Sequence, residues 1–242
     1  MVLINEETGG VCSILDGTYL TKLRTGATQG AATDILARKD SKVGVLFGTR
    51  EQVSSQLEAM LIARKLGKVY VFDINKKKAV EFTDKIHREL RGYDAEIIAD
   101  SDIDKILPTA DIITAETTSK KPVFDGRLVK EGAHINGVGA HTPDMQELDE
   151  YLVKKVDRVF VDSKEAVLSE AGDFTISMKH GTIGPNRING ELGEVISGKI
   201  PGRQNEKEIT LFKTVGIAVE DVVVVAEIYR RALSAGLETK LE

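Results

Sequence analysis

The residues that follow the first apolar run in the middle of the chain carry part of a dinucleotide-binding pattern. That pattern reads G-x-G-x-x-G or G-x-G-x-x-A and lies between a strand and a helix. Here the stretch reads GTREQV over residues 48–53, so Gly48 is kept while Arg50 and Val53 replace the second and third small residues. The second glycine normally lets the backbone approach a pyrophosphate, and the third allows the helix to pack closely on the strand. Taken alone, this stretch is a weak signal for dinucleotide binding.

Three features of the same region favour a bound dinucleotide. Thr49 and Gln52 have the spacing of a capping box, which predicts a helix N-terminus with free N–H groups directly after the strand. Asp73 ends the next apolar run, where an acid would hold the adenosine ribose hydroxyls. Arg50 could pair with a phosphate. The alternative is a simple helix cap, a turn and a solvated arginine. We favour dinucleotide binding, with Gly48 and Thr49 among the cofactor-binding residues.

The choice between the two nicotinamide dinucleotides depends on the charges around Asp73. The basic run at residues 76–78 would suit the additional 2′-phosphate of NADP, but a charge run at the start of a helix is usually solvated. Asp73 would repel that phosphate. We therefore predict NAD as the cofactor in preference to NADP.

Composition excludes several other classes of protein. The 242 residues are 41% hydrophobic and 29% charged, which is typical of a globular chain with one or two domains. A net charge of −5 and an aromatic content of 5% without tryptophan argue against a nucleic-acid or membrane partner. Cys12 has no second cysteine to pair with, no signal peptide is recognisable, and no metal-ligand spacing occurs. We expect a cytoplasmic protein without a metal.

Apolar runs alternate with helical stretches through the middle of the chain. Strands are predicted at 43–47, 69–72, 95–99, 110–115, 133–138 and 159–161, and helices at 51–66, 76–90 and 102–107. This alternation is typical of βαβ units, in which helices cover both faces of a parallel sheet. The sequence thus predicts an α/β fold with a Rossmann-type, doubly wound parallel sheet.

The two ends of the chain have a different pattern. Two short apolar pieces on either side of residues 5–10 predict a hairpin, and a helix is predicted over 20–39. Towards the C-terminus we predict a helix at 191–197, a strand at 209–213 and a long amphipathic helix at 217–233. We therefore divide the chain into a dinucleotide-binding domain at 41–165 and a second domain made of residues 1–40 and 166–242.

Three further motifs occur in a fixed order along the chain. They are LTKLRTGA at 20–27, GVGAHTPDMQELD at 137–149 and TLFKTVGIAVED at 210–221. Together with the nucleotide-binding pattern, they resemble the ornithine cyclodeaminase/mu-crystallin family, which includes alanine dehydrogenases and cyclic-imine reductases. The resemblance covers nearly the whole chain.

The resemblance implies a Rossmann domain beside a β-rich substrate and dimerisation domain, and a homodimer. It implies hydride transfer between NAD and the α-carbon of a small amino acid or cyclic imine, which in cyclodeaminases leads to ring closure. Members of the family carry an N-terminal segment with further strands and basic substrate ligands, and we expect this sequence to lack it.

Two alternatives to an active enzyme stay open. One is a weakly active or inactive homodimer with a binding or structural role, and the other is one subunit of a split enzyme.

The resemblance also assigns roles to single residues. Arg24 matches the arginine that holds the substrate carboxylate, and a planar guanidinium is the best bidentate partner of a carboxylate. His141 stands where cyclodeaminases have an aspartate, and a histidine there could move protons near neutral pH. A surface arginine and a polar loop residue are the alternatives. Val215 matches a substrate-binding position. Matches to cofactor-binding positions are Thr25, Gln52, Asp73, Thr117, Val138, Gly139 and Thr214.

Overall fold

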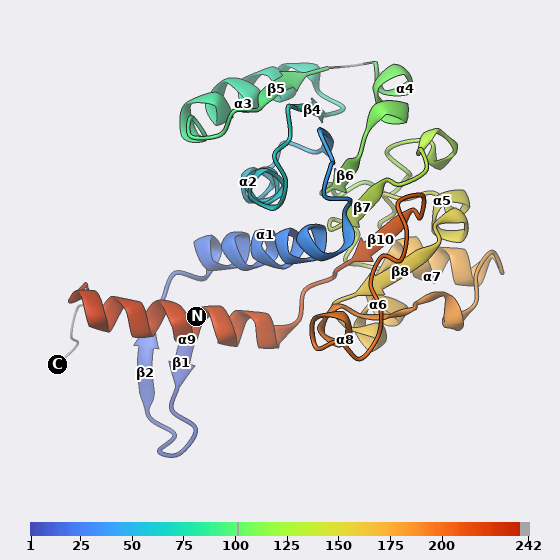
Figure 1. Cartoon of the computed structure of the whole chain (residues 1–242). Helices are drawn as coiled ribbons and strands as arrows, with labels where there is room; N and C mark the ends of the chain where they lie inside the picture. The colour runs from blue at the N-terminus through green and yellow to red at the C-terminus, as the bar shows by residue number, and fades with distance from the viewer. Residues whose placement is uncertain (101, 238–242) are drawn as a thin grey trace.

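A single parallel sheet forms the centre of the protein (Figure 1). The computed structural model describes residues 1–100 and 102–237, and within them eight strands pair in the order β5-β4-β3-β6-β7-β10-β8-β9. The strands are β3 (Val43–Phe47), β4 (Lys68–Phe72), β5 (Glu96–Ala99), β6 (Ile112–Ala115), β7 (His134–Gly137), β8 (Arg158–Val161), β9 (Gly190–Glu191) and β10 (Thr210–Lys213). From β3 the chain adds β4 and β5 on one side and then crosses to β6 on the other. Such a change of direction opens a crevice at the carboxyl ends of the strands, here those of β3 and β6.

Helices cover both faces of the sheet, and most strand side chains on both faces are apolar, as expected for strands buried on two sides. The helices are α1 (Gly17–Leu36), α2 (Val53–Ala63), α3 (Lys76–Glu89), α4 (Ile103–Ile106), α5 (Glu150–Lys155), α6 (Lys164–Glu170), α7 (Gly172–Lys179), α8 (Leu192–Ile196) and α9 (Ala218–Ala235), with short 3-10 turns at Leu107–Thr109, Gly126–Leu128 and Pro185–Arg187. One face packs against α1, α2, α3 and α8, and the other against α4 to α7.

Helix α1 is held on the sheet by close packing and by buried polar contacts. A Cβ at Gly26 would lie 2.9 Å from the side chain of Ser55, so a side chain at this position would push α1 away from α2. Further along the helix, the hydroxyl of Thr33 accepts hydrogen bonds from the amides of Gln29 at 2.9 Å and Asn136 at 3.0 Å. Because buried polar groups need these partners, the contacts fix the register of α1 against the sheet. Its N-terminal half therefore reaches the crevice.

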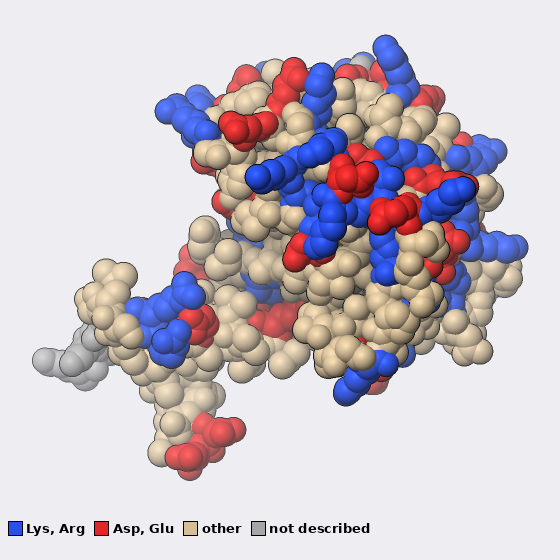
Figure 2. Space-filling model, viewed as in Figure 1, with Lys and Arg blue, Asp and Glu red and all other residues tan. Residues whose placement is uncertain are grey.

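A hairpin and the last helix project from this body (Figure 1). Strands β1 (Val2–Ile4) and β2 (Val11–Ile14) pair antiparallel, and α9 runs beside them. Apolar side chains of this projection are more than half exposed, namely Val2, Ile4, Val11, Ile14, Val219, Val222 and Val223. Figure 2 shows that charged side chains gather over the main body, while the shaft of the hairpin is largely uncharged. None of the helices that the structure describes is long and apolar enough to cross a membrane.

The predicted fold class is confirmed, since a parallel Rossmann-type sheet is accompanied by a small antiparallel unit. The strand predicted at residues 209–213 forms as β10, but it lies in the central sheet, where it pairs with β7 on one side and β8 on the other. The division of the chain into domains at residues 41 and 165 stays a prediction. Nothing in the local sequence of a short apolar strand indicates which neighbours it will pair with.

Candidate functional site

Two adjoining pockets lie at the carboxyl ends of the central strands, with volumes of about 830 and 1130 Å³. We call the smaller one the Arg24 pocket and the larger one the Asp73 pocket. The Arg24 pocket is lined, among others, by Arg24, Thr25, Gln52, Thr117, Val138, Gly139, His141, Thr214 and Val215. The Asp73 pocket is lined, among others, by Gly48, Thr49, Asp73 and Thr117. Every site residue predicted from the sequence therefore lines one pocket or both.

The Asp73 pocket has the local geometry that a dinucleotide needs. Gly48 has a φ of +103°, and any side chain there would collide with the backbone carbonyl of Glu116. A residue other than glycine would therefore strain the turn and close the gap between the β3 and β6 loops. The hydroxyl of Thr49 donates to Asp73 Oδ2 at 2.6 Å, and the N–H of Asn75 donates to Oδ1 at 2.8 Å. This carboxylate is thereby fixed at the end of β4, with lone pairs left for ribose hydroxyls.

The predicted capping box is wrong. Helix α2 begins at Val53, its N-cap is Gln52, and no side chain caps it. Thr49 lies three positions before this N-cap, and its hydroxyl donates to Asp73. The helix still begins directly after the β3 turn, so the positive end of its dipole lies at the crevice, while the N–H groups of Val53 and Ser55 donate to backbone carbonyls of the turn.

The two departures from the glycine pattern have different consequences. Val53 is fully buried in the cluster that joins α2 to the sheet, so it fills core space at the position of the third small residue. Arg50 is exposed and lines both pockets, so its side chain stands at the rim of the crevice. The residues of the Asp73 pocket thus fit a dinucleotide, with Arg50 as a large side chain at the position of the second glycine.

In the Arg24 pocket, the guanidinium is already paired. Its Nε lies 3.1 Å from Asp221 and its Nη1 lies 3.5 Å from Glu220, both in the first turn of α9. The guanidinium also packs against Gly216, in the loop that joins β10 to α9. Burial raises the pKa of Glu220, while a hydrogen bond to Thr28 and the charge of Arg24 act in the opposite direction. These contacts tie α1 to α9 across the mouth of the pocket.

Sequence reasoning missed the residue that positions Thr214 and Val215. Oδ2 of Asp162, directly after β8, accepts hydrogen bonds from the hydroxyl of Thr214 and the N–H groups of Val215 and Gly216, at 2.6, 2.9 and 2.8 Å. A single carboxylate oxygen thereby fixes the loop that closes one side of the pocket. The neighbouring strand end was predicted, but the pairing of β8 with β10 was not, and that pairing brings Asp162 to this loop.

The loop after β7 brings His141 to the pocket. Its Nδ1 lies 2.7 Å from the backbone carbonyl of Gly139, which places the proton on Nδ1 and leaves Nε2 as an acceptor. The side chain is exposed at the pocket. Glu147, eight positions after Gly139, accepts hydrogen bonds from the backbone N–H groups of Thr117, Gly139 and Ala140. It thereby holds the β6 and β7 loops together.

Glu116 is the second residue that sequence reasoning missed. It follows β6 directly, lines both pockets and is 8% exposed. Burial and the charge of Glu147 raise the pKa of its carboxyl to about 8. The sequence did contain a signal for Glu116, because an acidic residue directly after a buried strand costs free energy to bury and is therefore a candidate for a functional role.

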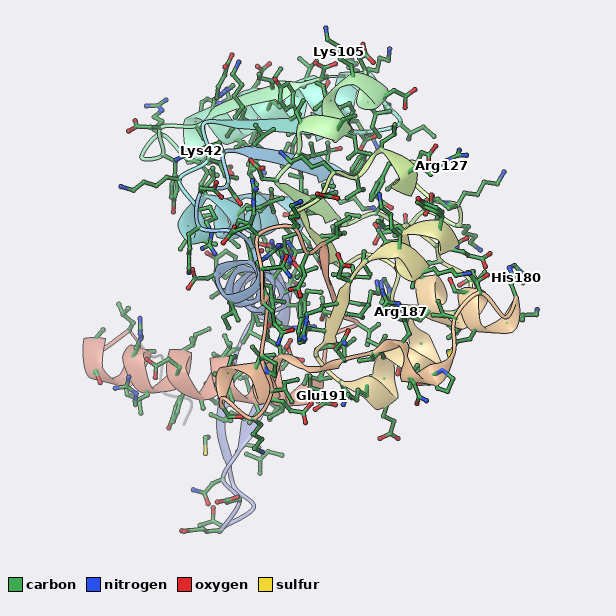
Figure 3. The ribbon with its side chains drawn as sticks, turned by 45° about the vertical axis from the view of Figure 1, so that its right-hand side comes forward. Lys42, Lys105, Arg127, His180, Arg187 and Glu191 are labelled. Atoms are coloured by element: carbon green, nitrogen blue, oxygen red, sulfur yellow. The ribbon has the colours of Figure 1, made fainter. Side chains whose placement is uncertain are left out.

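Other histidines lie outside the site. His180 contacts Glu150 at 2.7 Å and points away from the body at its outer edge (Figure 3). His134 is buried in β7, where burial lowers its pKa to about 3. Among residues 1–100 and 102–237, no group of three histidine, cysteine or acidic side chains is placed to hold a metal ion.

The sequence and the fold of this chain are both similar to those of known proteins. The sequence pattern described as the ornithine cyclodeaminase/mu-crystallin family matches residues 1–236. A Delta(1)-pyrroline-2-carboxylate reductase of Bacillus cereus is 39% identical over 242 residues, which is the whole chain and 73% of that protein. The structure of the Thermococcus litoralis Delta(1)-pyrroline-2-carboxylate reductase in complex with NADH and L-proline superposes with a TM-score of 0.94 at 40% identity, covering 99% of this chain and 73% of that one. An archaeal alanine dehydrogenase dimer with bound NAD gives a TM-score of 0.90 at 36% identity, over 100% and 73% of the two chains.

Proposed function

Because the chain belongs to the ornithine cyclodeaminase/mu-crystallin family, we propose that it is an NAD(H)-dependent oxidoreductase that acts at the α-carbon of an amino acid. The proposed reaction is the reduction of a small cyclic imino acid of the Δ1-pyrroline-2-carboxylate type, and its reverse. The likeness to a reductase complexed with NADH and L-proline supports this choice.

One observation carries the proposal. The Asp73 pocket and the Arg24 pocket adjoin, and Arg50, Glu51, Glu116, Thr117 and Thr118 line both. A dinucleotide with its ribose at Asp73 and its phosphates at the α2 N-terminus would extend towards the pocket that holds Arg24, whose side chain is 14% exposed. The cofactor would thus meet an anionic substrate at the boundary between the two.

The chain's own residues have separable tasks in this proposal. Bound nicotinamide supplies or accepts the hydride. Arg24 binds the substrate carboxylate through Nη2, because Nε and Nη1 already contact Asp221 and Glu220. Thr214 and Val215, fixed by Asp162, close over the reactants. His141 presents Nε2 to the pocket as a proton acceptor.

We propose reduction rather than cyclodeamination because of His141. An aspartate at this position suits ring closure in the cyclodeaminases that the sequence resembles, whereas this chain has an imidazole exposed to solvent. A neutral imidazole offers no negative charge to stabilise a cationic intermediate during ring closure.

We also propose that the protein forms a homodimer through its projection. The exposed valines and isoleucines of β1, β2 and α9 form an apolar surface that needs a cover. A second copy would cover it isologously, and the alanine dehydrogenase with 36% identity is a dimer. The cytoplasm stays the predicted location.

The test is direct. The purified chain should quench or shift NADH fluorescence, and it should oxidise NADH with Δ1-pyrroline-2-carboxylate faster than it reduces NAD with alanine or ornithine. Release of ammonia from ornithine without net NAD reduction would instead establish a cyclodeaminase. Absence of NADH binding and of all turnover would favour the inactive homodimer.

A further inference from the structure

A buried carboxyl with an unused oxygen lies at the boundary of the two pockets. Glu116 is 8% exposed, and among the described residues no partner hydrogen-bonds its Oε2. Gln56, on the first turns of α2 beside it, is fully buried, and neither amide atom makes a well-formed hydrogen bond. Native proteins rarely leave two neighbouring polar groups unsatisfied in this way. Such a pair indicates a place where a ligand completes the hydrogen bonding.

The charges around Glu116 decide where a proton resides. Behind it, Glu147 is fully buried and accepts three backbone N–H groups. Burial raises the pKa of Glu147, but the ammonium of Lys213 opposes this shift, and Asp173 lies 3.2 Å from that ammonium. The three N–H donors require Glu147 as an acceptor, which favours its carboxylate.

Glu116 has none of these donors. Burial and the charge of Glu147 raise its pKa to about 8, and contact with Gln56 opposes the shift only in part. From the α2 side Arg50 and Glu51 face the same boundary, and both are exposed to water. In the Arg24 pocket, the charge of Arg24 is balanced by Glu220 and Asp221. Near neutral pH the proton of this cluster therefore sits on Glu116.

We propose that Glu116 exchanges a proton with the substrate nitrogen during hydride transfer, and this inference rests on the proposed function. In reduction, the Glu116 carboxyl gives its proton to the imine nitrogen, and hydride from the dihydronicotinamide adds to the adjacent carbon. The products are the amine, NAD⁺ and the Glu116 carboxylate, which regains a proton from solvent. In amine oxidation, the carboxylate removes the proton from nitrogen while hydride leaves the α-carbon.

His141 is a poorer donor for this step. Its Nδ1 is held by the carbonyl of Gly139, so in the neutral ring the one proton lies on Nδ1 and only an imidazolium could donate from Nε2. Glu116 holds a proton out of contact with bulk water, as a general acid with a pKa near the working pH should. The two residues then divide the site, with Glu116 at its inner boundary and His141 at its exposed edge.

The experiment compares the full chain with Glu116→Gln and with Glu131→Gln, an exposed glutamate in the turn before β7. We measure kcat/KM for Δ1-pyrroline-2-carboxylate reduction and for proline oxidation against pH, and NADH affinity by fluorescence. For the wild type, reduction should fall about tenfold per pH unit above a pKa of about 8, and oxidation should rise to a plateau through the same pKa. Glu116→Gln should lose about 100-fold or more in both directions and lose this limb. Its NADH affinity should stay within about threefold, and Glu131→Gln should match the wild type.

A second readout does not depend on turnover. The infrared carbonyl band of a protonated carboxyl should be present in the unliganded wild type near neutral pH, and absent from Glu116→Gln. If Glu116→Gln fails to fold, Glu116→Asp tests the same point, because a shorter acid keeps the pH limb at a lower rate. An active wild type with an equally active, equally pH-dependent Glu116→Gln would overturn the inference and leave the proposed function intact. A wild type that binds NADH but reduces no imine would overturn the proposed function itself.

Discussion

The two pockets of the crevice differ in how far along the chain their walls come from. In the Asp73 pocket, the bond from Thr49 to Asp73 spans 24 positions, within one βαβ unit. In the Arg24 pocket, the pair of Arg24 and Asp221 spans 197 positions, and the bond from Thr214 to Asp162 spans 52. The first pocket also takes one wall from residues 116–123 after β6, so it needs β6 beside this βαβ unit. The second needs α1, α9 and the far half of the sheet to be correctly packed.

The pockets also differ in how their charges are compensated. Asp73 is partly exposed and accepts two neutral donors, so water and local hydrogen bonds stabilise its charge. Around the Arg24 pocket, Lys213 and Asp173 are fully buried, and Arg24 and Glu220 are mostly buried. Buried ion pairs gain little net stability over apolar packing, but removing one partner leaves a costly charge behind. We therefore expect large effects from changes in the second pocket and small ones in the first.

The largest effect should arise at the boundary, in the pH dependence of stability for Glu116→Gln. The folded-state pKa of Glu116, about 8, lies above the unfolded value of about 4.3. Between these two values the folded state binds more protons, so the wild type loses stability as pH rises. The glutamine variant lacks this loss. Relative to wild type, it should gain about 2–4 kcal/mol between pH ~4 and pH ~9, measured by urea unfolding.

Glu131→Gln serves as the control for that measurement, because it removes an exposed carboxyl outside the two pockets. A constant difference between wild type and Glu116→Gln across this pH range would mean that Glu116 titrates normally. The boundary between the two pockets would then hold no proton at Glu116, and it would not differ in this respect from the solvated Asp73 pocket.

Arg24→Ala should have the next largest effect. A charge-assisted pair with the substrate carboxylate is worth about 2–3 kcal/mol, so kcat/KM should fall by about 100-fold. The variant also leaves Glu220 and Asp221 without their cation, so the chain should become less stable near neutral pH. NADH affinity should change little because Arg24 does not line the Asp73 pocket. Arg127→Ala, at the surface in Figure 3, is the matched control.

An Arg24→Ala variant with normal turnover would exclude the carboxylate role. A large loss of NADH affinity would show instead that the two pockets form one cooperative unit, and that the Asp73 pocket depends on the same distant contacts as the Arg24 pocket.

The same division separates what the sequence could predict from what it could not. Gly48, Asp73 and the alternating strands were predicted because each depends on residues nearby in the chain. Arg24 and His141 were assigned by matching family motifs. Such a match indicates that a residue reaches the site, but it does not say which long-range contacts bring the residue there. Glu116 and Asp162 were missed. Their importance depends on which strand ends lie side by side, and the pairing of β10 with β7 and β8 leaves no local trace.

Propensity patterns failed in one further place for a physical reason. Thr49 and Gln52 have the spacing of a capping box, but the helix begins only at Val53, so Thr49 lies too far from its first turn to cap it. Its hydroxyl donates to Asp73 instead, at the end of the next strand.

Asp73→Asn tests the local pocket and should have a smaller effect. An amide can still accept from Thr49, but it loses the charge that holds ribose hydroxyls and repels a 2′-phosphate. NADH affinity should fall by about tenfold, NADPH affinity should fall less or rise, and the thermal midpoint should stay close to wild type. Asp94→Asn, an exposed residue before β5, is the control. A wild type that prefers NADPH would reverse the cofactor assignment.

Arg50→Gly should have the smallest effect, and it tests whether the Arg50 side chain at the rim of the crevice hinders or helps the binding of a dinucleotide. Arg50 is exposed, so its removal costs no core packing. If its Cβ and chain crowd the pyrophosphate, Arg50→Gly should tighten NADH binding by a few-fold, while Arg50→Ala, which keeps the Cβ, should not. If the guanidinium is a phosphate ligand, both variants should bind NADH more weakly, and the loss should shrink at high salt because added ions screen an exposed pair. We expect the first result, because the positive end of the α2 dipole already favours an anion at this end of the crevice. Fluorescence titration of the wild type and both variants at two ionic strengths separates the outcomes. Weaker binding by Arg50→Gly would show that the Asp73 pocket has exchanged a glycine contact for an ionic one.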